Sequence, residues 1–417
     1  MKSKVQPIRR STKRSRFEWT IRCVLAIAAV ALGGLSTTQT IAFALRKVNA
    51  ERAYALAPYD GRVAGELAQH IAAGDVSTEQ RARATAIAQQ ALVDEPLAIP
   101  ALTALGINTQ LRGDTVEARE LFAHSDALSR RELGTRLWLI EDAVGRGDTA
   151  GALRNYDIAL RTEKGASELL FPILAQAISD SRLASALADT MAARPAWSEP
   201  FIGYLAAVST TPDISAPFLQ QLAKRGVPIS EAARISMVNA LVNIGKMDAG
   251  WSYYASFHKG AARDRSRDPN FAFSRETPAA FDWVPVTSEA GINASIQSTS
   301  TGGVFDFAVS SSVGGTVLQQ TQLLPPGRYR LEGISAGIQQ APSTRPYWQL
   351  TCSDGHEAGR VELPNSTENG GRFTGEVTVG AGCPTQVLRL VVRPSLEVGG
   401  VGGQIERAAL VPVAAGR

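Results

Sequence analysis

The sequence predicts a multidomain α + β protein in which a single transmembrane helix precedes an α-solenoid of helical hairpins and then an antiparallel β-sandwich. Three observations predict this order. A long apolar segment follows a basic leader, an Ala- and Leu-rich stretch broken by Gly-Asp and Pro fills the middle, and short β-branched and aromatic runs fill the last third. The 417 residues are enough for two or three domains.

Composition excludes several classes of protein. The chain is 44% apolar and 20% charged, as in ordinary globular proteins, which excludes a fully disordered chain and a multi-span transporter. Three Cys and four scattered His are too few for a zinc array, and no phosphate-binding glycine loop is present, so we expect no metal and no cofactor. Residues 1–22 hold eight Lys or Arg and one Glu, which leaves 35 basic and 38 acidic residues elsewhere. The body is therefore mildly acidic, and we expect no nucleic acid partner.

The amino-terminal segment predicts a membrane anchor. Residues 1–21 form a basic tail, and residues 22–44 form the anchor, in which Cys23 to Leu35 is free of charge. A membrane helix needs about 20 residues, so the Ser, Thr and Gln side chains at 36–40 must lie in the outer half of the bilayer. The positive tail stays in the cytoplasm, and Trp19 suits the interface.

A cleaved signal peptide is the alternative interpretation of the same residues. Ala42-Phe43-Ala44 fits the small-residue pattern of a cleavage site. Both interpretations export the body. We therefore expect a protein of the bacterial inner membrane, with a cytoplasmic amino terminus and a periplasmic body.

Residues 45–260 contain an internal repeat. Gly113-Asp114 recurs 34 residues later as Gly147-Asp148. The glycine supplies a positive φ for a tight turn, and the aspartate caps the following helix. Small residues on both sides of the turn allow two helices to approach closely, and an aromatic residue packs against the next hairpin.

This stretch resembles the tetratricopeptide-repeat family. The positions that carry the resemblance are Leu102, Leu105, Gly106, Gly113, Asp114, Ala118, Phe122, Leu139, Gly147, Asp148, Ala152 and Tyr156. Weaker copies on both sides suggest five or six hairpins in a curved stack. The resemblance implies a protein partner in the inner membrane or periplasm. The peptide-carboxylate clamp of some family members is absent, so it implies no carboxy-terminal peptide ligand.

A polar linker at 261–278 precedes a predicted β-sandwich at 279–417. Leu388, Leu390 and Val392 alternate with Arg389 and Arg393, as in a strand with one buried face. The predicted strands are 280–286, 292–299, 303–311, 316–324, 327–338, 347–354, 359–364, 372–380, 386–395 and 403–413. No helical pattern intervenes, which favours antiparallel pairing.

The sandwich region contains four recognisable motifs: Asp268-Pro269-Asn270-Phe271, Phe281-Asp282-Trp283, PPGRYRL at 325–331 and the closing GQIERAALVPV. In these motifs the region resembles jelly-roll carbohydrate-binding modules and their galactose-binding-like relatives. The resemblance implies polysaccharide as a ligand, because sugar faces stack on aromatic rings while amides and Arg hold hydroxyls. The candidate ligand residues are Trp283, Tyr347, Trp348, Arg345 and Gln349, although a Trp in a sandwich also commonly lies in the core.

Cys352 and Cys383 fall on strands that could be neighbours, and an oxidising compartment would join them. Gly333-Ile334-Ser335-Ala336-Gly337 matches a hydrolase motif, but its surroundings read as strand throughout, and no helix follows. We therefore predict no catalytic residue.

The predicted function is a non-enzymatic, membrane-anchored periplasmic scaffold that supports envelope or exopolysaccharide assembly. The helical repeats would bind a protein, and the sandwich would contact glycan. Two alternatives stay open: a periplasmic glycan hydrolase or lyase, and a purely structural tether.

Overall fold

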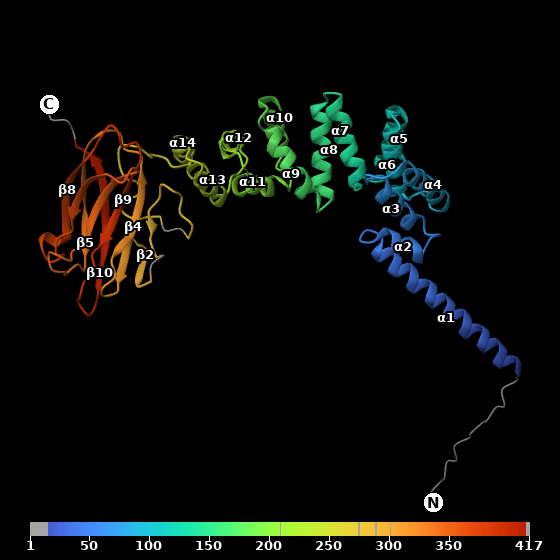
Figure 1. Ribbon diagram of the computed structural model, residues 1–417, viewed down its shortest axis with the longest axis horizontal. Coiled ribbons are helices and arrows are strands. Elements are labelled where there is room, and N and C mark those ends of the chain that lie inside the picture. The colour runs from blue at the N-terminus through green and yellow to red at the C-terminus, as the bar shows by residue number, and fades with distance from the viewer. Residues whose placement is uncertain (1–15, 209, 274–275, 288–289, 301, 414–417) are drawn as a thin grey trace, which may run out of the picture. The chain divides into compact units, whose positions relative to one another are not determined.

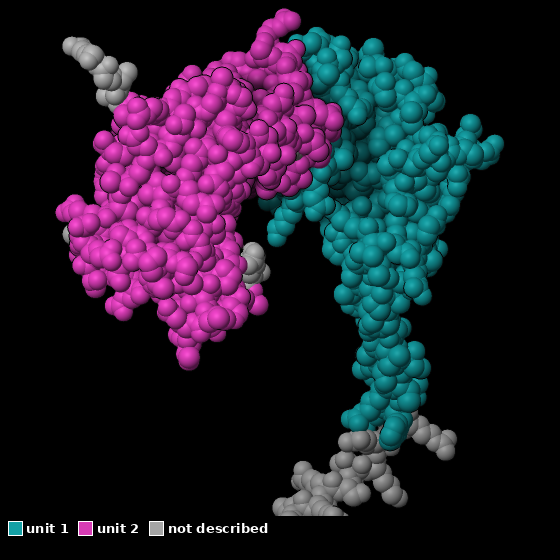
Figure 2. Space-filling view, turned by 60° about the vertical axis from the view of Figure 1, so that its left-hand side comes forward, with its two compact units in different colours: residues 1–170 teal, residues 171–417 magenta. Residues whose placement is uncertain are grey.

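The computed structural model describes residues 16–208, 210–273, 276–287, 290–300 and 302–413 (Figure 1). The predicted basic tail therefore lies outside the described residues as far as residue 15. The described residues form fourteen α-helices followed by two five-stranded antiparallel sheets, which confirms the predicted fold class. The chain divides into two compact units, residues 1–170 and 171–417 (Figure 2).

Helix α1 (Arg16–Leu45) is long and apolar enough to cross a membrane, and a signal sequence would have the same character. The polar patch in its second half is satisfied within the helix. The hydroxyl of Thr37 donates to the carbonyl of Gly33 at 2.8 Å, and that of Thr40 donates to the carbonyl of Ser36 at 2.7 Å. These bonds allow hydroxyl side chains in an apolar environment at little cost.

The remaining helices of unit 1 pack against their neighbours in sequence, with α3 on α4, α5 on α6 and α7 on α8. Their bounds are α2 Ala50–Leu56, α3 Gly61–Ala72, α4 Thr78–Asp94, α5 Ile99–Leu111, α6 Thr115–Leu128, α7 Leu133–Gly145 and α8 Thr149–Thr162. Helix α9 (Ala166–Ala177) crosses the division between the units.

The two Gly-Asp turns have the same local structure. Gly113 and Gly147 adopt positive φ values of 91° and 72°. Asp114 and Asp148 each accept a hydrogen bond from the backbone amide three residues later, at 3.0 and 2.8 Å. Each turn thus ends one helix and caps the next, as the residue types predict.

Where two helices of the repeat meet, one helix contributes a small residue and the other contributes an aromatic residue. A Cβ on Gly106 would lie 2.7 Å from the ring of Phe122, so only glycine fits there. Phe122 is fully buried and stacks on Trp138 with 4.4 Å between ring centroids. Of the other repeat positions, the structure buries Leu102, Ala118, Ala152 and Tyr156 and half-buries Leu105 and Leu139.

Unit 2 begins within α9 and continues through five further helices to the sandwich. The bounds of these helices are α10 Ser181–Ala192, α11 Ser198–Ala207, α12 Pro212–Lys224, α13 Glu231–Asn243 and α14 Met247–Phe257. Helices α12, α13 and α14 are in mutual contact.

The two sheets have the strand orders β1-β4-β9-β6-β7 and β2-β3-β10-β5-β8. The strands are β1 Val284–Pro285, β2 Ile292–Thr299, β3 Gly302–Val309, β4 Gly315–Gln322, β5 Gly327–Ala336, β6 Tyr347–Cys352, β7 Glu357–Glu362, β8 Arg372–Val379, β9 Gln386–Val392 and β10 Val401–Pro412. Each predicted run overlaps one of them, although β3, β4, β7 and β10 begin one or two residues before the predicted start. Their inward side chains form a single core that includes Phe305, Trp348 and Leu390.

The predicted linker at 261–278 is in part an element of the sandwich. The amide of Ser266 donates to the carbonyl of Leu410 on β10 at 3.0 Å, and the carbonyl of Pro269 accepts a bond from another β10 amide at 2.9 Å. Phe271 is fully buried in the sandwich core. A polar sequence between domains looks like a solvated connector, but here its backbone pairs with β10, the central strand of its sheet, beyond the residues of β10 that pair with β3. Of its two phenylalanines, Phe271 fills the core and Phe273 is exposed.

The predicted disulfide between Cys352 and Cys383 is present. Cys352 ends β6, and Cys383 lies in the connection between β8 and β9. The bond ties that connection to the end of a neighbouring strand.

Candidate functional site

Two of the predicted sugar-binding residues are wrong, because they lie inside the core. Trp283 is 3% exposed and Trp348 is fully buried, with 5.7 Å between their ring centroids. The indole N–H of Trp283 donates to the carbonyl of Asp268 at 2.9 Å. Strand alternation explains the outcome for β6, since Trp348 points inward and its neighbours Tyr347 and Gln349 point outward. A buried indole offers no face to a sugar.

The outward residues of the β1-β4-β9-β6-β7 sheet bring polar side chains together. Gln319 on β4 pairs with Arg389 on β9, Arg389 pairs with Gln349 on β6, and Gln349 pairs with Arg360 on β7. We call these four residues the polar row. Residues in register on adjacent strands share a face, and the strand spacing makes the row about 14 Å long. That length suits an extended chain of polar groups such as a short oligosaccharide.

Arg389 occupies the middle of the polar row, on the central strand of the sheet. It is half-buried and forms no ion pair or hydrogen bond with any described residue. The carboxamide of Gln319 on one side also forms no hydrogen bond within the described chain. Gln349 on the other side donates to Glu357 and keeps its carbonyl oxygen free. The row therefore presents one uncompensated guanidinium between two amides.

Tyr347 adjoins the polar row, but its ring is already covered. The guanidinium carbons of Arg360 and Arg393 lie 4.2 and 4.3 Å from the ring centroid. Arg360 also pairs with Glu357 at 3.0 Å, and Arg393 pairs with Glu362 at 2.6 Å. A sugar that stacked on Tyr347 would have to displace a guanidinium. The ring therefore serves as a wall of the site rather than as a platform.

The carboxylates beside the row are paired as counter-ions. Hydrogen bonds from Arg360, and then from Gln349, hold the pKa of Glu357 below its usual range. A general acid for glycoside cleavage needs the opposite shift. The hydrolase-like motif is also accounted for, because Ser335 is buried on β5 and donates to the carbonyl of Gly371 at 3.1 Å. Among the described residues, no group of three His, Cys, Asp or Glu side chains is placed to hold a metal.

Arg345 lies at the end of this face, in the loop before β6. Its guanidinium reaches Glu368 at 3.4 Å and the carbonyl of Gln340 at 3.3 Å, so it is bound to its own loop. Of the five predicted ligand residues, two lie on the outer face, one at its end and two in the core. Three members of the polar row were missed, namely Gln319, Arg389 and Arg360, although the alternation along β9 already indicated an outward Arg389.

Comparison with known proteins gives no family assignment. No family model matches the sequence, and no curated protein is significantly similar to it. Three solved structures illustrate the similarities that exist. The enzymatically active domain of tailspike protein 4 from bacteriophage CBA120 is 13% identical over 31% of this chain, with a TM-score of 0.24, and the match spans 19% of the tailspike chain. The type IV pilus biogenesis factor PilW is 16% identical over 48% of this chain and 93% of its own, with a TM-score of 0.25.

The third is the carbohydrate-binding module CsCBM6-3 from Clostridium stercorarium, solved in complex with cellobiose. It is 12% identical over 33% of this chain and 95% of its own, with a TM-score of 0.21. Scores and identities at this level carry no functional argument. The function is therefore argued from the chain's own residues.

Proposed function

We propose that the chain is a non-enzymatic, membrane-anchored scaffold of the bacterial envelope, with a sandwich that binds glycan and a helical region that binds protein. The guanidinium of Arg389 carries the glycan part, because it lies between two carboxamides and has no partner among the described residues. Such groups on one rigid sheet face can donate to and accept from several hydroxyls at once. The ionised pair of Glu357 with Arg360 supports binding without cleavage.

The carboxy-terminal end of α1 supports an uncleaved anchor. The helix continues through Ala42-Phe43-Ala44, and Ala42 is fully buried against Ala53 and Val63. Proteolysis favours exposed, irregular segments, so a helix packed at this point is a poor substrate. We therefore propose a single-pass protein of the inner membrane, with the basic tail in the cytoplasm and the body in the periplasm, in support of envelope or exopolysaccharide assembly.

The glycan proposal is tested by retention of the purified full-length chain, in detergent, on immobilised envelope polysaccharides. Arg389→Gln should reduce retention at least about fivefold, because a charge-assisted hydrogen bond is lost. Arg372→Gln is the matched control. Arg372 is exposed on the outer face of the other sheet, and it too lacks a partner among the described residues. Equal retention by the two variants, or no retention of the wild type on any polysaccharide, would overturn the proposal.

A further inference from the structure

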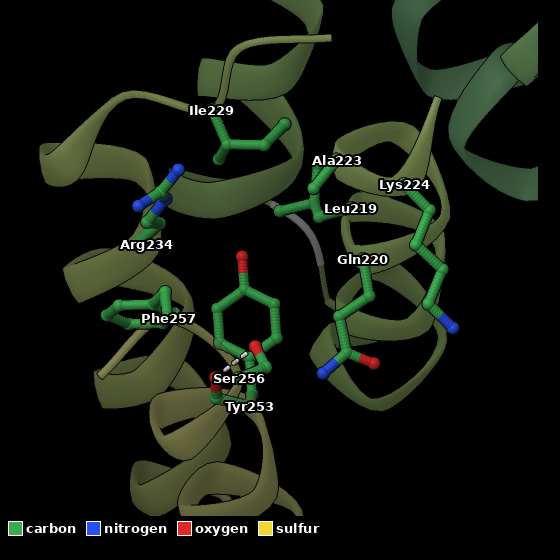
Figure 3. Close-up of a pocket in the computed structure, with 9 residues that line it drawn as sticks. All are labelled: Leu219, Gln220, Ala223, Lys224, Ile229, Arg234, Tyr253, Ser256 and Phe257. Atoms are coloured by element: carbon green, nitrogen blue, oxygen red, sulfur yellow. Dashed lines mark hydrogen bonds between the residues drawn. The ribbon is translucent and has the colours of Figure 1, made fainter. Parts of the chain in front are cut away.

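A pocket of about 440 Å³ lies between α12, α13 and α14, apart from the sandwich face (Figure 3). Its lining is contributed by all three helices and by the turn between α12 and α13. The lining residues are Leu219, Gln220, Ala223, Lys224, Ile229, Arg234, Tyr253, Ser256 and Phe257. Part of the wall is apolar. The lining also includes two basic residues, Lys224 and Arg234, and no acidic residue.

The hydroxyl of Tyr253 points into this pocket (Figure 3). The side chain is only 4% exposed, and its hydroxyl forms no hydrogen bond with any described residue. Burial raises the pKa of Tyr253 to about 12, so the hydroxyl stays a hydrogen-bond donor at neutral pH. Because the hydroxyl faces the pocket and has no acceptor among the described residues, it is available to donate to an acceptor that a ligand supplies.

Arg234 provides a positive charge beside this donor. Its guanidinium carbon lies 5.4 Å from the ring centroid of Phe257, and it forms no ion pair with any residue in the described ranges. Lys224 and Gln220 line another part of the pocket. The pocket therefore suits a ligand with an anionic oxygen that accepts hydrogen bonds and an adjacent apolar group that contacts Leu219 and Ile229.

We propose that this pocket binds an acidic side chain of a partner polypeptide together with an adjacent apolar side chain. The inference rests on the proposed function, in which the helical region binds a protein, and it specifies the side chains of that partner. Three observations favour this occupant. The charge is complementary, the donor is already placed, and a volume near the lower end of the ~300–1,000 Å³ range of ligand sites suits a pair of side chains rather than a long acyl chain.

The test uses an array of peptides blocked at both ends and varied at two central positions over all residue types. The array is probed with the labelled full-length chain in detergent. We expect retention of peptides in which Asp or Glu adjoins Leu, Ile or Phe. In solution, changing the peptide's Glu to Gln should weaken binding about tenfold, as expected for loss of a charge-assisted hydrogen bond.

Two variants locate the binding in the pocket. Arg234→Gln and Tyr253→Phe should each weaken the best peptide at least about fivefold, because each removes one donor to the carboxylate. Tyr253→Phe deletes only a hydroxyl that forms no hydrogen bond with any described residue, so the melting temperature of this variant should not fall. Lys246→Gln removes one charge from an exposed position just before α14, outside the pocket, and should leave binding unchanged.

Three results would overturn the inference: no peptide retained above background, no preference for an acidic residue, or wild-type affinity in both pocket variants. Displacement of the peptide by dodecanoate, with dodecanoate alone binding more tightly than any peptide, would assign the pocket to an amphiphile instead. Glycan retention is tested at Arg389 on the sandwich, and peptide binding is tested at Arg234 and Tyr253 in the pocket. Failure of one experiment therefore does not affect the outcome of the other.

Discussion

The phenolic hydroxyl of Tyr254 on α14 donates a hydrogen bond to Oδ1 of Asp282 at 2.7 Å, and this bond fixes the last helix to the segment that enters β1. Replacing Tyr254 with Phe keeps the ring that stacks on His258 and removes only the donor. Since the acceptor is a carboxylate, we expect the free energy of unfolding to fall by about 1.5–3 kcal/mol, measured by urea unfolding.

Tyr253 supplies the matched control for this experiment. It adjoins Tyr254 in sequence, but its hydroxyl has no hydrogen-bond partner among the described residues. Tyr253→Phe should therefore leave the unfolding free energy unchanged or raise it slightly. Equal losses from the two substitutions would show that the bond to Asp282 does not stabilise the fold.

Gly106 tests the close helix contact of the repeat. A methyl group there would lie 2.7 Å from the Phe122 ring, which is itself held against Trp138. Gly106→Ala should destabilise the chain by about 1–3 kcal/mol through overpacking, measured by thermal unfolding. Gly145→Ala is the control, because a Cβ at this helical position meets nothing within 4 Å and alanine favours helix, so it should be neutral or stabilising. A neutral Gly106→Ala would contradict the argument.

The turns and the strand faces could be predicted from residue type and spacing alone. The positive φ of Gly113 and the cap by Asp114 follow from residue type and spacing, and strand alternation along β9 follows from period two. The same alternation along β6 places Trp348 inside and Tyr347 outside, whereas the chemistry of the two side chains suggests a ligand role for both.

What the sequence does not reveal depends on contacts between distant segments. That the guanidinium of Arg389 and the hydroxyl of Tyr253 have no partner among the described residues can be established only when every neighbouring strand or helix is in place. Arg267 is the clearest case. It lies in a charged stretch that is typical of a solvated linker, yet it is 7% exposed, because its neighbours Ser266 and Pro269 pair with β10, the central strand of a sheet.

Arg267 holds together three parts of the sandwich entry. Its guanidinium donates to the carbonyl of Phe281 at 2.8 Å, to the side chain of Gln322 at 3.0 Å and to the carbonyl of Thr321. Burial lowers its pKa to about 10, so it remains charged at neutral pH. Arg267→Met keeps most of the volume and leaves these acceptors unpaired, so we expect a loss of about 3 kcal/mol or more in chemical unfolding.

Arg265, two residues earlier, is the control for Arg267. It is half exposed and pairs with the adjacent Asp264 at 2.8 Å, a contact of little worth in water. Arg265→Met should change the unfolding free energy by less than about 0.5 kcal/mol. If the two variants unfold alike, the buried guanidinium has no special role.

The disulfide between Cys352 and Cys383 closes a separation of 31 residues. In the chain-entropy account such a loop is worth about 3–4 kcal/mol, so the double alanine variant should unfold at clearly lower denaturant than the oxidised wild type. Reduction of the wild type should reproduce that loss. Cys23→Ser, at the one free cysteine among the described residues, should change nothing. Identical midpoints for oxidised and reduced chains would contradict the prediction.

The anchor interpretation predicts both the mass and the topology of the chain in cells. Because Ala42 packs on Ala53 while still within α1, the membrane fraction should contain an intact chain of 44.3 kDa by mass spectrometry.

The topology is tested by labelling single cysteines. Lys47→Cys, exposed just beyond the helix, should react with a membrane-impermeant maleimide in intact cells whose outer membrane admits the reagent. Ser3→Cys should react only after the inner membrane is opened, because the basic tail stays in the cytoplasm. A chain whose first residue follows Ala44 would establish a signal peptide and leave the body without a membrane tether, whereas labelling of Ser3→Cys in intact cells would reverse the topology.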